Sequence, residues 1–310
     1  MKIRIETVGG YSSGLGHITR MRVLAKELIE KHKAEVEVVT DYKPFKQEDI
    51  VIVDVDTEYE ALSRVYTIRE NLPKAKIIVF RNGDINISMG TITFGGTRLD
   101  VNSIIEPTFD NVILDKCFRR GRHPYETLKD NIKFIFLNQG GSDPWGIAPR
   151  ILHVLDLLRV RSTILVVVGS ATHDLTVKQI KAFGNVHNDL PVVVYYDEPP
   201  IELKDLMSYS DVAITAPGQT FAELTAMSVP SIVIGHHEMH GRISRELGDK
   251  KAAIDLGVGV GMTDEELVYK LGSALGIMKS LKTRKNFVNN ARKLININGI
   301  DKIIEYILEI

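Results

Sequence analysis

The sequence contains a single cysteine, Cys117, among 310 residues. One cysteine excludes a disulfide within the chain and a zinc site made of four cysteines. Apolar runs such as 164–168 are far shorter than the roughly 18 residues that a membrane span needs. Residues 1–5 alternate charged side chains with isoleucine and contain no signal-peptide core. We therefore expect a soluble protein of a reducing compartment, the cytoplasm, without a membrane span.

Net charge is nearly absent as well. The 39 Lys and Arg residues balance 40 Asp and Glu residues, which leaves a net charge of −1. This balance excludes capture of nucleic acid or of an anionic membrane by bulk charge, so we predict no nucleic-acid partner. What is present is ordinary globular composition, with 44% hydrophobic residues. At about 150 residues per domain, the length predicts two domains.

Short β-branched runs alternate with longer amphipathic segments along nearly the whole chain. Runs such as 50–53 are apolar at consecutive positions, as expected for parallel strands that helices cover on both faces. The alternation predicts an α/β fold with parallel sheets built from βαβ units. The predicted strands are 3–8, 36–40, 50–55, 77–80, 112–114, 133–137, 164–168, 192–196, 212–215 and 231–234. The clearest helical patterns are 18–29, 58–71, 149–158, 265–278 and 301–310.

The seam between the two domains is predicted in the polar stretch 119–131, after which a new strand begins. We place an N-terminal domain at 1–125 and a C-terminal domain at 126–310. The last helix, 301–310, can pack on either half. Because ligands of open parallel sheets bind where the chain leaves a strand, we searched the strand-end loops for function.

The first such loop, 9–20, is rich in glycine and leads into a helix that opens with His17. Glycines such as Gly14 and Gly16 let backbone amides approach a ligand, and the helix start favours negative charge. The loop is not the dinucleotide-binding fingerprint. His17 can act as a general base or donate a hydrogen bond to a phosphate or sugar hydroxyl. The alternative is a glycine-rich turn in which His17 only caps the helix.

The second loop follows the first strand of the C-terminal half. Gly140 and Gly141 clear space there, and Ser142 can donate or accept a hydrogen bond. Asp143 and Pro144 are typical of an N-cap and the first helical residue, so a well-made helix start is the alternative. That alternative leaves the paired glycines unexplained.

The third loop, 215–220, leads into a helix that begins near Gln219. Thr220 and the amides of the helix start suit a diphosphate, and Glu223, one turn later, could accept both hydroxyls of a ribose. Thr220 and Glu223 also have the spacing of a capping box, and the two interpretations are equally good from this loop alone.

The fourth loop holds three histidines, His236, His237 and His240. Glycines flank the segment, and the H-E-x-x-H pattern of zinc enzymes is absent from it. Histidines that line a ligand cleft are therefore favoured over a zinc site.

Together these loops resemble those of a known family. The first resembles the G-x-G-H-x-x-R loop of UDP-sugar hydrolases of the PseG type, which act in pseudaminic acid biosynthesis. The second resembles the G-G-x-D-P motif of that family, and the third is similar to the nucleotide-binding segment shared with MurG-like glycosyltransferases. The residues that carry the resemblance are Gly14, Gly16, His17, Arg20, Gly140, Gly141, Asp143, Pro144, Thr220, Glu223, Leu224 and Pro230.

The resemblance implies GT-B architecture, in which two Rossmann-like domains with parallel sheets face each other across a cleft. The C-terminal domain would hold UDP, with Glu223 on the ribose and with Gln219 and Thr220 on the diphosphate. The N-terminal domain would present the catalytic residue His17. The other implied substrate-binding residues are Gly14, Gly16, Arg20, Asp54, Gly140, Gly141, Ser142 and Gly218.

The implied reaction is cleavage of the anomeric C–O bond of a UDP-sugar, which releases UDP and a modified free sugar for surface-glycan or nonulosonic acid biosynthesis. His17 would activate water or an acceptor hydroxyl. The resemblance implies no metal and no cofactor, because helix N-termini and backbone amides stabilise the leaving diphosphate. One alternative is an inverting MurG-like glycosyltransferase with a UDP-sugar donor, and another is a non-catalytic nucleotide-sugar binding protein. The family's Asp-His-Tyr is Asp54-Val55-Asp56 here, a change that a different substrate or acceptor would require.

Overall fold

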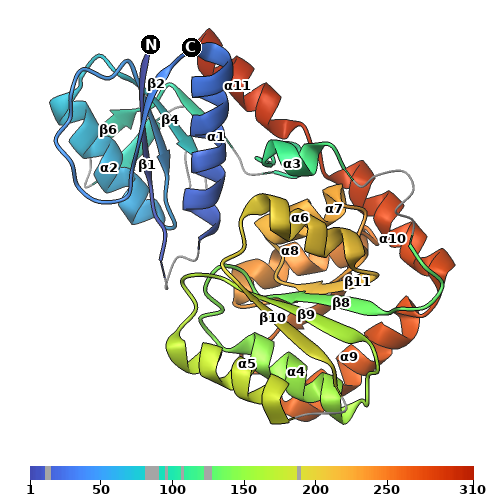
Figure 1. Cartoon of the computed structure of the whole chain (residues 1–310). Coiled ribbons are helices and arrows are strands. Elements are labelled where there is room, and N and C mark those ends of the chain that lie inside the picture. Colours follow the sequence, from blue (N-terminus) through green and yellow to red (C-terminus); the bar gives the residue numbers. More distant parts are fainter. Residues whose placement is uncertain (11–14, 81–90, 95–96, 106–107, 122–127, 187–189) are drawn as a thin grey trace. The chain divides into compact units, whose positions relative to one another are not determined.

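The computed structural model describes residues 1–10, 15–80, 91–94, 97–105, 108–121, 128–186 and 190–310 (Figure 1). The chain forms two compact units, each with its own parallel sheet. Unit 1 comprises Met1–Leu114 and Asn298–Ile310, and unit 2 comprises Asp115–Ile297. Within the described ranges, every helix is too short or too polar to cross a bilayer.

Unit 1 contains a five-stranded parallel sheet and a separate two-stranded antiparallel hairpin. Its strands are β1 (Lys2–Thr7), β2 (Glu35–Val39), β3 (Ile50–Asp54), β4 (Lys76–Phe80), β5 (Thr91–Phe94), β6 (Thr97–Asp100) and β7 (Ser103–Ile105), and its helices are α1 (Gly16–His32), α2 (Glu58–Asn71) and α11 (Gly299–Glu309). The parallel sheet has the order β2-β1-β3-β4-β7, and β5 pairs with β6.

Both faces of the unit 1 sheet are buried, which explains its continuous apolar runs. Ile50 and Ile52 of β3 pack in one cluster with residues of α1 and α11. Val51 and Val53, which point to the opposite face, pack in a second cluster with residues of α2. Figure 1 shows α2 on one side of this sheet and α1 with α11 on the other.

Unit 2 is built around a six-stranded parallel sheet of order β10-β9-β8-β11-β12-β13. Its strands are β8 (Phe134–Asn138), β9 (Thr163–Val168), β10 (Val192–Tyr196), β11 (Val212–Thr215), β12 (Ser231–Gly235) and β13 (Ile254–Val258). Its helices are α3 (Lys116–Arg119), α4 (Ile147–Leu157), α5 (Asp174–Val186), α6 (Pro200–Tyr209), α7 (Gln219–Ala226), α8 (Glu238–Asp249), α9 (Asp264–Met278) and α10 (Leu281–Leu294). Figure 1 shows α4, α5 and α9 on one face of the sheet, and α6, α7 and α8 on the other.

Each sheet reverses its direction of winding at one place. In unit 1 the chain runs from β1 outward to β2 and then returns to place β3 on the other side of β1. In unit 2 it runs from β8 through β9 to β10, and then returns to place β11 against β8. Loops diverge at the carboxyl ends of such strand pairs, and ligands of doubly wound sheets bind in the crevice that this leaves. Ligand sites are therefore expected at the carboxyl ends of β1 and β3 and at those of β8 and β11. We call these two places the β1–β3 edge and the β8–β11 edge.

The fifth predicted strand, 112–114, is wrong. Residues 112–114 form no strand although Ile113 and Leu114 are buried, and the sheet edge beside β4 is occupied by β7 instead. Apolar residues here fill space beneath α11 without entering the ladder. Strands β5, β6, β7 and β13 are not among the predicted strands.

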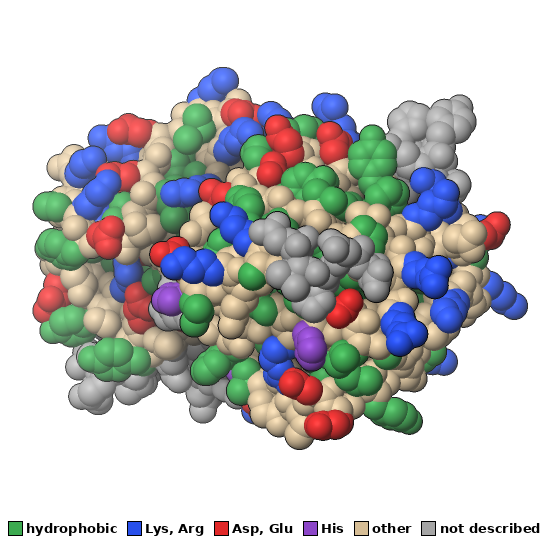
Figure 2. Space-filling model, turned by 60° about the horizontal axis from the view of Figure 1, so that its bottom comes forward, with side chains coloured by type: hydrophobic (Ala, Val, Ile, Leu, Met, Phe, Trp, Pro, Cys, Tyr) green, Lys and Arg blue, Asp and Glu red, His purple; other side chains and the backbone are tan. Residues whose placement is uncertain are grey.

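The boundary between the units also differs from the sequence-based placement at 125/126. It follows Leu114, because Phe118 of α3 is buried and α3 packs against α6 and α7 of unit 2. The last helix joins unit 1, where Ile300, Ile303 and Ile307 of α11 enter the cluster beneath α1. Figure 2 shows Lys and Arg side chains mixed with Asp and Glu side chains on the face in view, as the balanced composition leads one to expect.

Candidate functional sites at the two sheet edges

In unit 1, three predicted site residues and a fourth polar side chain lie in contact at the β1–β3 edge. His17 and Arg20 come from the first turns of α1, Asp54 is the last residue of β3, and Asp56 follows it. The N-cap of α1 is Leu15, so the interpretation of His17 as a capping residue is wrong. Gly14 lies outside the described residues. At Gly16, the first residue of α1, an added Cβ would meet no atom within 4 Å.

The Asp54 carboxylate organises this site. Arg20 donates to it twice, from Nε to Oδ2 at 2.7 Å and from Nη2 to Oδ1 at 2.5 Å. The Nδ1 atom of His17 lies 3.0 Å from Oδ1 of the same carboxylate. On the other side of the ring, Nε2 lies 2.6 Å from Oδ1 of Asp56. A guanidinium, a carboxylate, an imidazole and a second carboxylate thus follow one another in contact.

Burial and charge act in opposite directions on these groups. Burial alone would raise the pKa of Asp54, but the charge of Arg20 and the hydrogen bonds from His17 and Arg20 hold it well below its usual range. Burial would lower the pKa of His17, but its hydrogen bonds to Asp54 and Asp56 outweigh that effect and raise the pKa above its usual value. The contacts with charged neighbours therefore shift the pKa of Asp54 downward and that of His17 upward, each against the effect of burial.

In unit 2, the loop after β8 and the start of α7 meet at the β8–β11 edge. The Thr220 hydroxyl donates to Oδ1 of Asn138 at 3.2 Å, and the same oxygen accepts from the Gly140 amide at 2.9 Å. The Asn138 side-chain amide donates to the backbone carbonyl of Val167 at 2.9 Å. Asn138, the last residue of β8, thus ties three segments together. Asn138 is not among the predicted site residues, although a polar residue that ends a buried apolar run is a usable signal.

The N-terminus of α7 has no side-chain cap. Its N-cap is Gly218, which gives no side-chain cap, and an added Cβ there would meet no atom within 4 Å. Thr220 lies inside the helix and bonds to Asn138, so the capping-box interpretation of Thr220 and Glu223 is wrong. A helix start that no side chain caps attracts anionic groups such as a diphosphate.

Glu223 is a buried carboxyl one turn into α7. Burial raises its pKa to about 8; a hydrogen bond with Gln219 opposes this rise, and the charge of Asp115 adds to it. Near neutral pH the group is therefore mostly a neutral acid. Asp115 is not a predicted neighbour of Glu223, because the two are 108 positions apart and only the fold brings them together.

The backbone conformation and packing of the 140–142 loop account for its two glycines. Gly140 has a φ of +78°, a conformation that side chains rarely adopt. Gly141 lies against Gly169, the residue after β9, so closely that a Cβ on Gly169 would be 2.4 Å from the Gly141 carbonyl oxygen. Ser142 is buried beside them.

The helix that follows this loop starts later than predicted. It begins at Ile147, with Gly146 as its N-cap, so Asp143 and Pro144 are not its N-cap and first residue. The buried Asp143 carboxylate still accepts from the amides of Ile147 and Ala148, at 2.8 and 2.9 Å.

Replacing Gly169 with alanine is expected to destabilise the protein by about 1–3 kcal/mol, because the added methyl group displaces the backbone of Gly141. Urea unfolding measures the change. The matched control is Gly276→Ala, at an exposed position of α9 where an added Cβ meets no atom within 4 Å. That variant should gain up to about 1 kcal/mol. Equal stability of the two variants would contradict the tight Gly141–Gly169 contact.

The fourth loop joins β12 to α8, and its histidines pack together. The rings of His237 and His240 stack with centroids 4.3 Å apart, and His236 Nε2 lies 3.2 Å from Oε1 of the buried Gln139. Burial and the neighbouring histidine charge lower the pKa of His236 to about 4 and that of His240 to about 3. Both rings are therefore neutral at physiological pH. In the described part of the chain, no group of three or more His, Cys, Asp or Glu side chains is placed to hold a metal ion.

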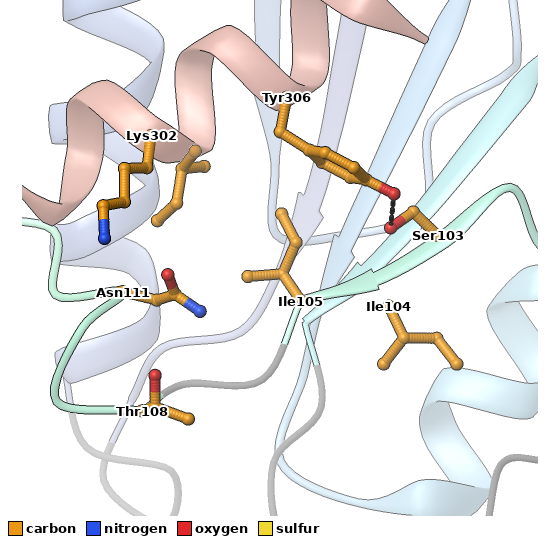
Figure 3. A pocket seen from close by; sticks show the side chains of 8 residues that line it. Ser103, Ile104, Ile105, Thr108, Asn111, Lys302 and Tyr306 are labelled. Atoms are coloured by element: carbon orange, nitrogen blue, oxygen red, sulfur yellow. Dashed lines mark hydrogen bonds between the residues drawn. The ribbon is translucent and has the colours of Figure 1, made fainter.

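A pocket of about 460 Å³ lies elsewhere in unit 1, between α11 and the segment that follows β7. Figure 3 shows Tyr306 and Lys302 entering from α11, with the Tyr306 hydroxyl bonded to Ser103 of β7. Ile105 and Asn111 line the opposite wall. Among the residues that the structure describes, none of the predicted site residues lines this pocket.

Proteins of known structure or role resemble this chain over nearly its whole length. No protein-family model matches the chain. The chain is 26% identical to the spore coat polysaccharide biosynthesis protein SpsG of Bacillus subtilis, over 98% of this chain and 96% of that protein. The crystal structure of Acinetobacter baumannii MurG matches with a TM-score of 0.64 and 13% identity, over 100% of this chain and 99% of that one. The fold is GT-B.

A second solved structure shares this GT-B fold. Anabaena HepE, in complex with UDP-glucose, matches with a TM-score of 0.64 and 14% identity, over 100% of this chain and 99% of that chain. The predicted fold class, GT-B with two Rossmann-like units, is confirmed. At such identities the similarity shows the fold, and the chemistry has to be argued from the residues themselves.

Proposed function

We propose that this chain is a UDP-sugar-using enzyme of the GT-B type that acts in polysaccharide biosynthesis. The observation that carries the proposal is found in each unit separately. The predicted catalytic residue lies at the winding reversal of the unit 1 sheet, and the predicted nucleotide-binding residues lie at that of the unit 2 sheet, the places where doubly wound folds bind ligands. The relative named for spore coat polysaccharide biosynthesis and the neighbour crystallised with UDP-glucose support it.

Unit 2 binds the nucleotide in this proposal. The ionised Glu223 carboxyl accepts hydrogen bonds from the ribose hydroxyls, while the α7 start at Gln219 and Thr220 receives the diphosphate. Gly140 to Ser142 border the phosphates. Because peptide amides are fixed dipoles, they stabilise the charge that develops on the departing UDP without reorganising.

Unit 1 supplies His17 as the group that activates the attacking hydroxyl, within the cluster that it forms with Arg20, Asp54 and Asp56. We propose hydrolysis as the reaction, with water attacking the anomeric carbon and UDP and a free modified sugar as products. Transfer to an acceptor is the second candidate. Asp56 favours it, since a carboxylate stands where the resemblance to PseG-type hydrolases leads one to expect an aromatic hydroxyl.

A single assay tests these possibilities. Purified protein is incubated with a panel of UDP-sugars without an acceptor, and free sugar and UDP are measured. We expect free sugar and UDP in equal amounts, whereas ADP-sugars as a control should give neither. Turnover only after an acceptor is added supports transfer, and tight uridine binding without any turnover supports a binding protein. Absence of both turnover and uridine-nucleotide binding would contradict the proposed function.

A further inference from the structure

The side chain of Asn138 makes four hydrogen bonds at the carboxyl end of β8. Its Oδ1 atom accepts from the Gly140 amide at 2.9 Å and from the Thr220 hydroxyl at 3.2 Å. Its Nδ2 atom donates to the backbone carbonyls of Val167 at 2.9 Å and of Gly140 at 3.3 Å. An asparagine amide offers two hydrogens and two lone pairs, so these bonds use the whole hydrogen-bonding capacity of this buried side chain.

These partners fix the orientation of the Asn138 side chain. A carbonyl oxygen can only accept and a backbone amide can only donate, so Nδ2 faces the two carbonyls and Oδ1 faces the Gly140 amide. An aspartate would place a carboxylate oxygen against two carbonyl oxygens, and an alanine would remove all four bonds. The position therefore suits an amide and neither a carboxylate nor an apolar side chain.

Two of the four bonds shape the 140–142 loop. Asn138 binds both the amide and the carbonyl of Gly140, whose φ is +78°. The side chain thus holds the first residue of the loop in a left-handed conformation. It thereby also fixes the direction in which the peptide groups on either side of Gly140 point.

A third bond joins this loop to α7. Strands β8 and β11 are neighbours, with Asn138 opposite Thr215, and α7 begins at Gln219, shortly after β11 ends. Thr220, in the first turn of α7, bonds to Asn138. One side chain therefore links the 140–142 loop to the uncapped start of α7, and these are the two elements to which the proposed function assigns the phosphates.

We propose that Asn138 is a positioning residue of the nucleotide site. It sets the spacing and direction of the 140–142 loop relative to the start of α7, so that both face the diphosphate of the bound nucleotide. Peptide dipoles stabilise a developing charge without reorganising only when neighbouring groups hold them in place. Asn138 acts through Gly140 and Thr220, and the inference rests on the proposed function, in which unit 2 binds UDP.

The opposite end of the same strand pair provides a matched control. There the buried carboxylate of Asp211, just before β11, accepts from the backbone amides of Lys133 and Phe134 at 2.8 and 3.1 Å. Like Asn138, Asp211 connects the β8 and β11 segments through a buried polar side chain, but it lies at the amino ends of the strands. If Asn138 were only structural, replacing either residue should have the same consequences.

The first test compares Asn138→Ala with Asp211→Ala. Both variants should unfold at a lower urea concentration than the wild-type protein, because each loses buried hydrogen bonds. Only Asn138→Ala should raise the Kd for UDP, by about 10–100-fold, as expected when binding groups lose their alignment. Its Kd for uridine, which has no phosphates, should change much less, and isothermal titration measures both. An unchanged Kd for UDP in folded Asn138→Ala, an equal loss in Asp211→Ala, or equal losses for UDP and uridine would overturn the inference.

The second test is a double-mutant cycle with Thr220→Val, which removes the hydroxyl that bonds to Asn138. The double variant should lose less affinity for UDP than the product of the two separate losses, because both changes remove the same bond. Fully multiplicative losses would overturn the inference. If Asn138→Ala does not fold, Thr220→Val takes its place beside Asp211→Ala, and an unchanged Kd for UDP there would overturn the inference.

The wild-type protein distinguishes the two levels of the argument. Absence of UDP binding by the wild-type protein would overturn the proposed function together with the role of Asn138. Wild-type binding of UDP with an unaffected Asn138→Ala variant would overturn only the role of Asn138.

Discussion

Replacing His17 with alanine should lower kcat by about 10²–10⁴-fold and leave the affinity for UDP close to that of the wild-type protein. The ring lies in unit 1, whereas every residue proposed to bind the nucleotide belongs to unit 2. Without the ring, Asp54 retains its ion pair with Arg20, but the imidazole that contacts both Asp54 and Asp56 is lost. Steady-state kinetics give the loss in kcat, and isothermal titration with UDP gives the affinity.

The control for this variant is His153→Ala, which removes an exposed histidine of α4. It should match the wild-type protein in both kcat and affinity. Thermal unfolding of the His17 variant shows whether the fold survives, since a folded protein with lost turnover is the expected result. Unchanged turnover in His17→Ala would exclude His17 as the group that activates the attacking hydroxyl.

The strands and the ligand edges of this fold could be predicted because they depend on local pattern. A buried parallel strand is apolar at consecutive positions, and polar residues such as Asn138 follow directly where it ends. The positions of His17 and Glu223 in strand-end loops therefore predict that both lie at the carboxyl ends of strands. The same pattern wrongly predicts a strand at 112–114, because apolar residues that are buried without backbone pairing look like a strand in the sequence.

The side-chain contacts within the sites could not be predicted, because they depend on strand order and helix packing. Asp56 bonds to His17 only because β3 returns to lie beside β1, and no local pattern encodes that pairing. The influence of Asp115 on Glu223 depends in the same way on where α3 packs. Both contacts change the protonation of a side chain, so the chemistry of the sites was less accessible than their location.

The affinity for UDP should increase about tenfold between pH 7 and pH 9. Burial raises the pKa of the free Glu223 carboxyl to about 8, so at pH 7 most molecules carry it as a neutral acid. Accepting hydrogen bonds from two ribose hydroxyls favours the ionised form, and binding therefore releases the proton. As the pH rises through 8, the proton is lost before binding, and the cost of releasing it disappears. Isothermal titration in two buffers of different ionisation enthalpy should detect about one proton released at pH 7 and almost none at pH 9.

Two variants separate this linkage from a general effect of pH. Glu223→Gln should bind UDP with an affinity that does not vary between pH 7 and pH 9, and at pH 9 it should be about 1.5–3 kcal/mol weaker than wild type. It should unfold at a temperature no lower than wild type at pH 7, because the wild-type side chain is already neutral there. Asp115→Asn removes a charge that raises the pKa of Glu223, so it should bind UDP more tightly than wild type at pH 7 and equally at pH 9. A wild-type affinity that is constant across this range, with no proton released, would show that the ribose is not held by Glu223.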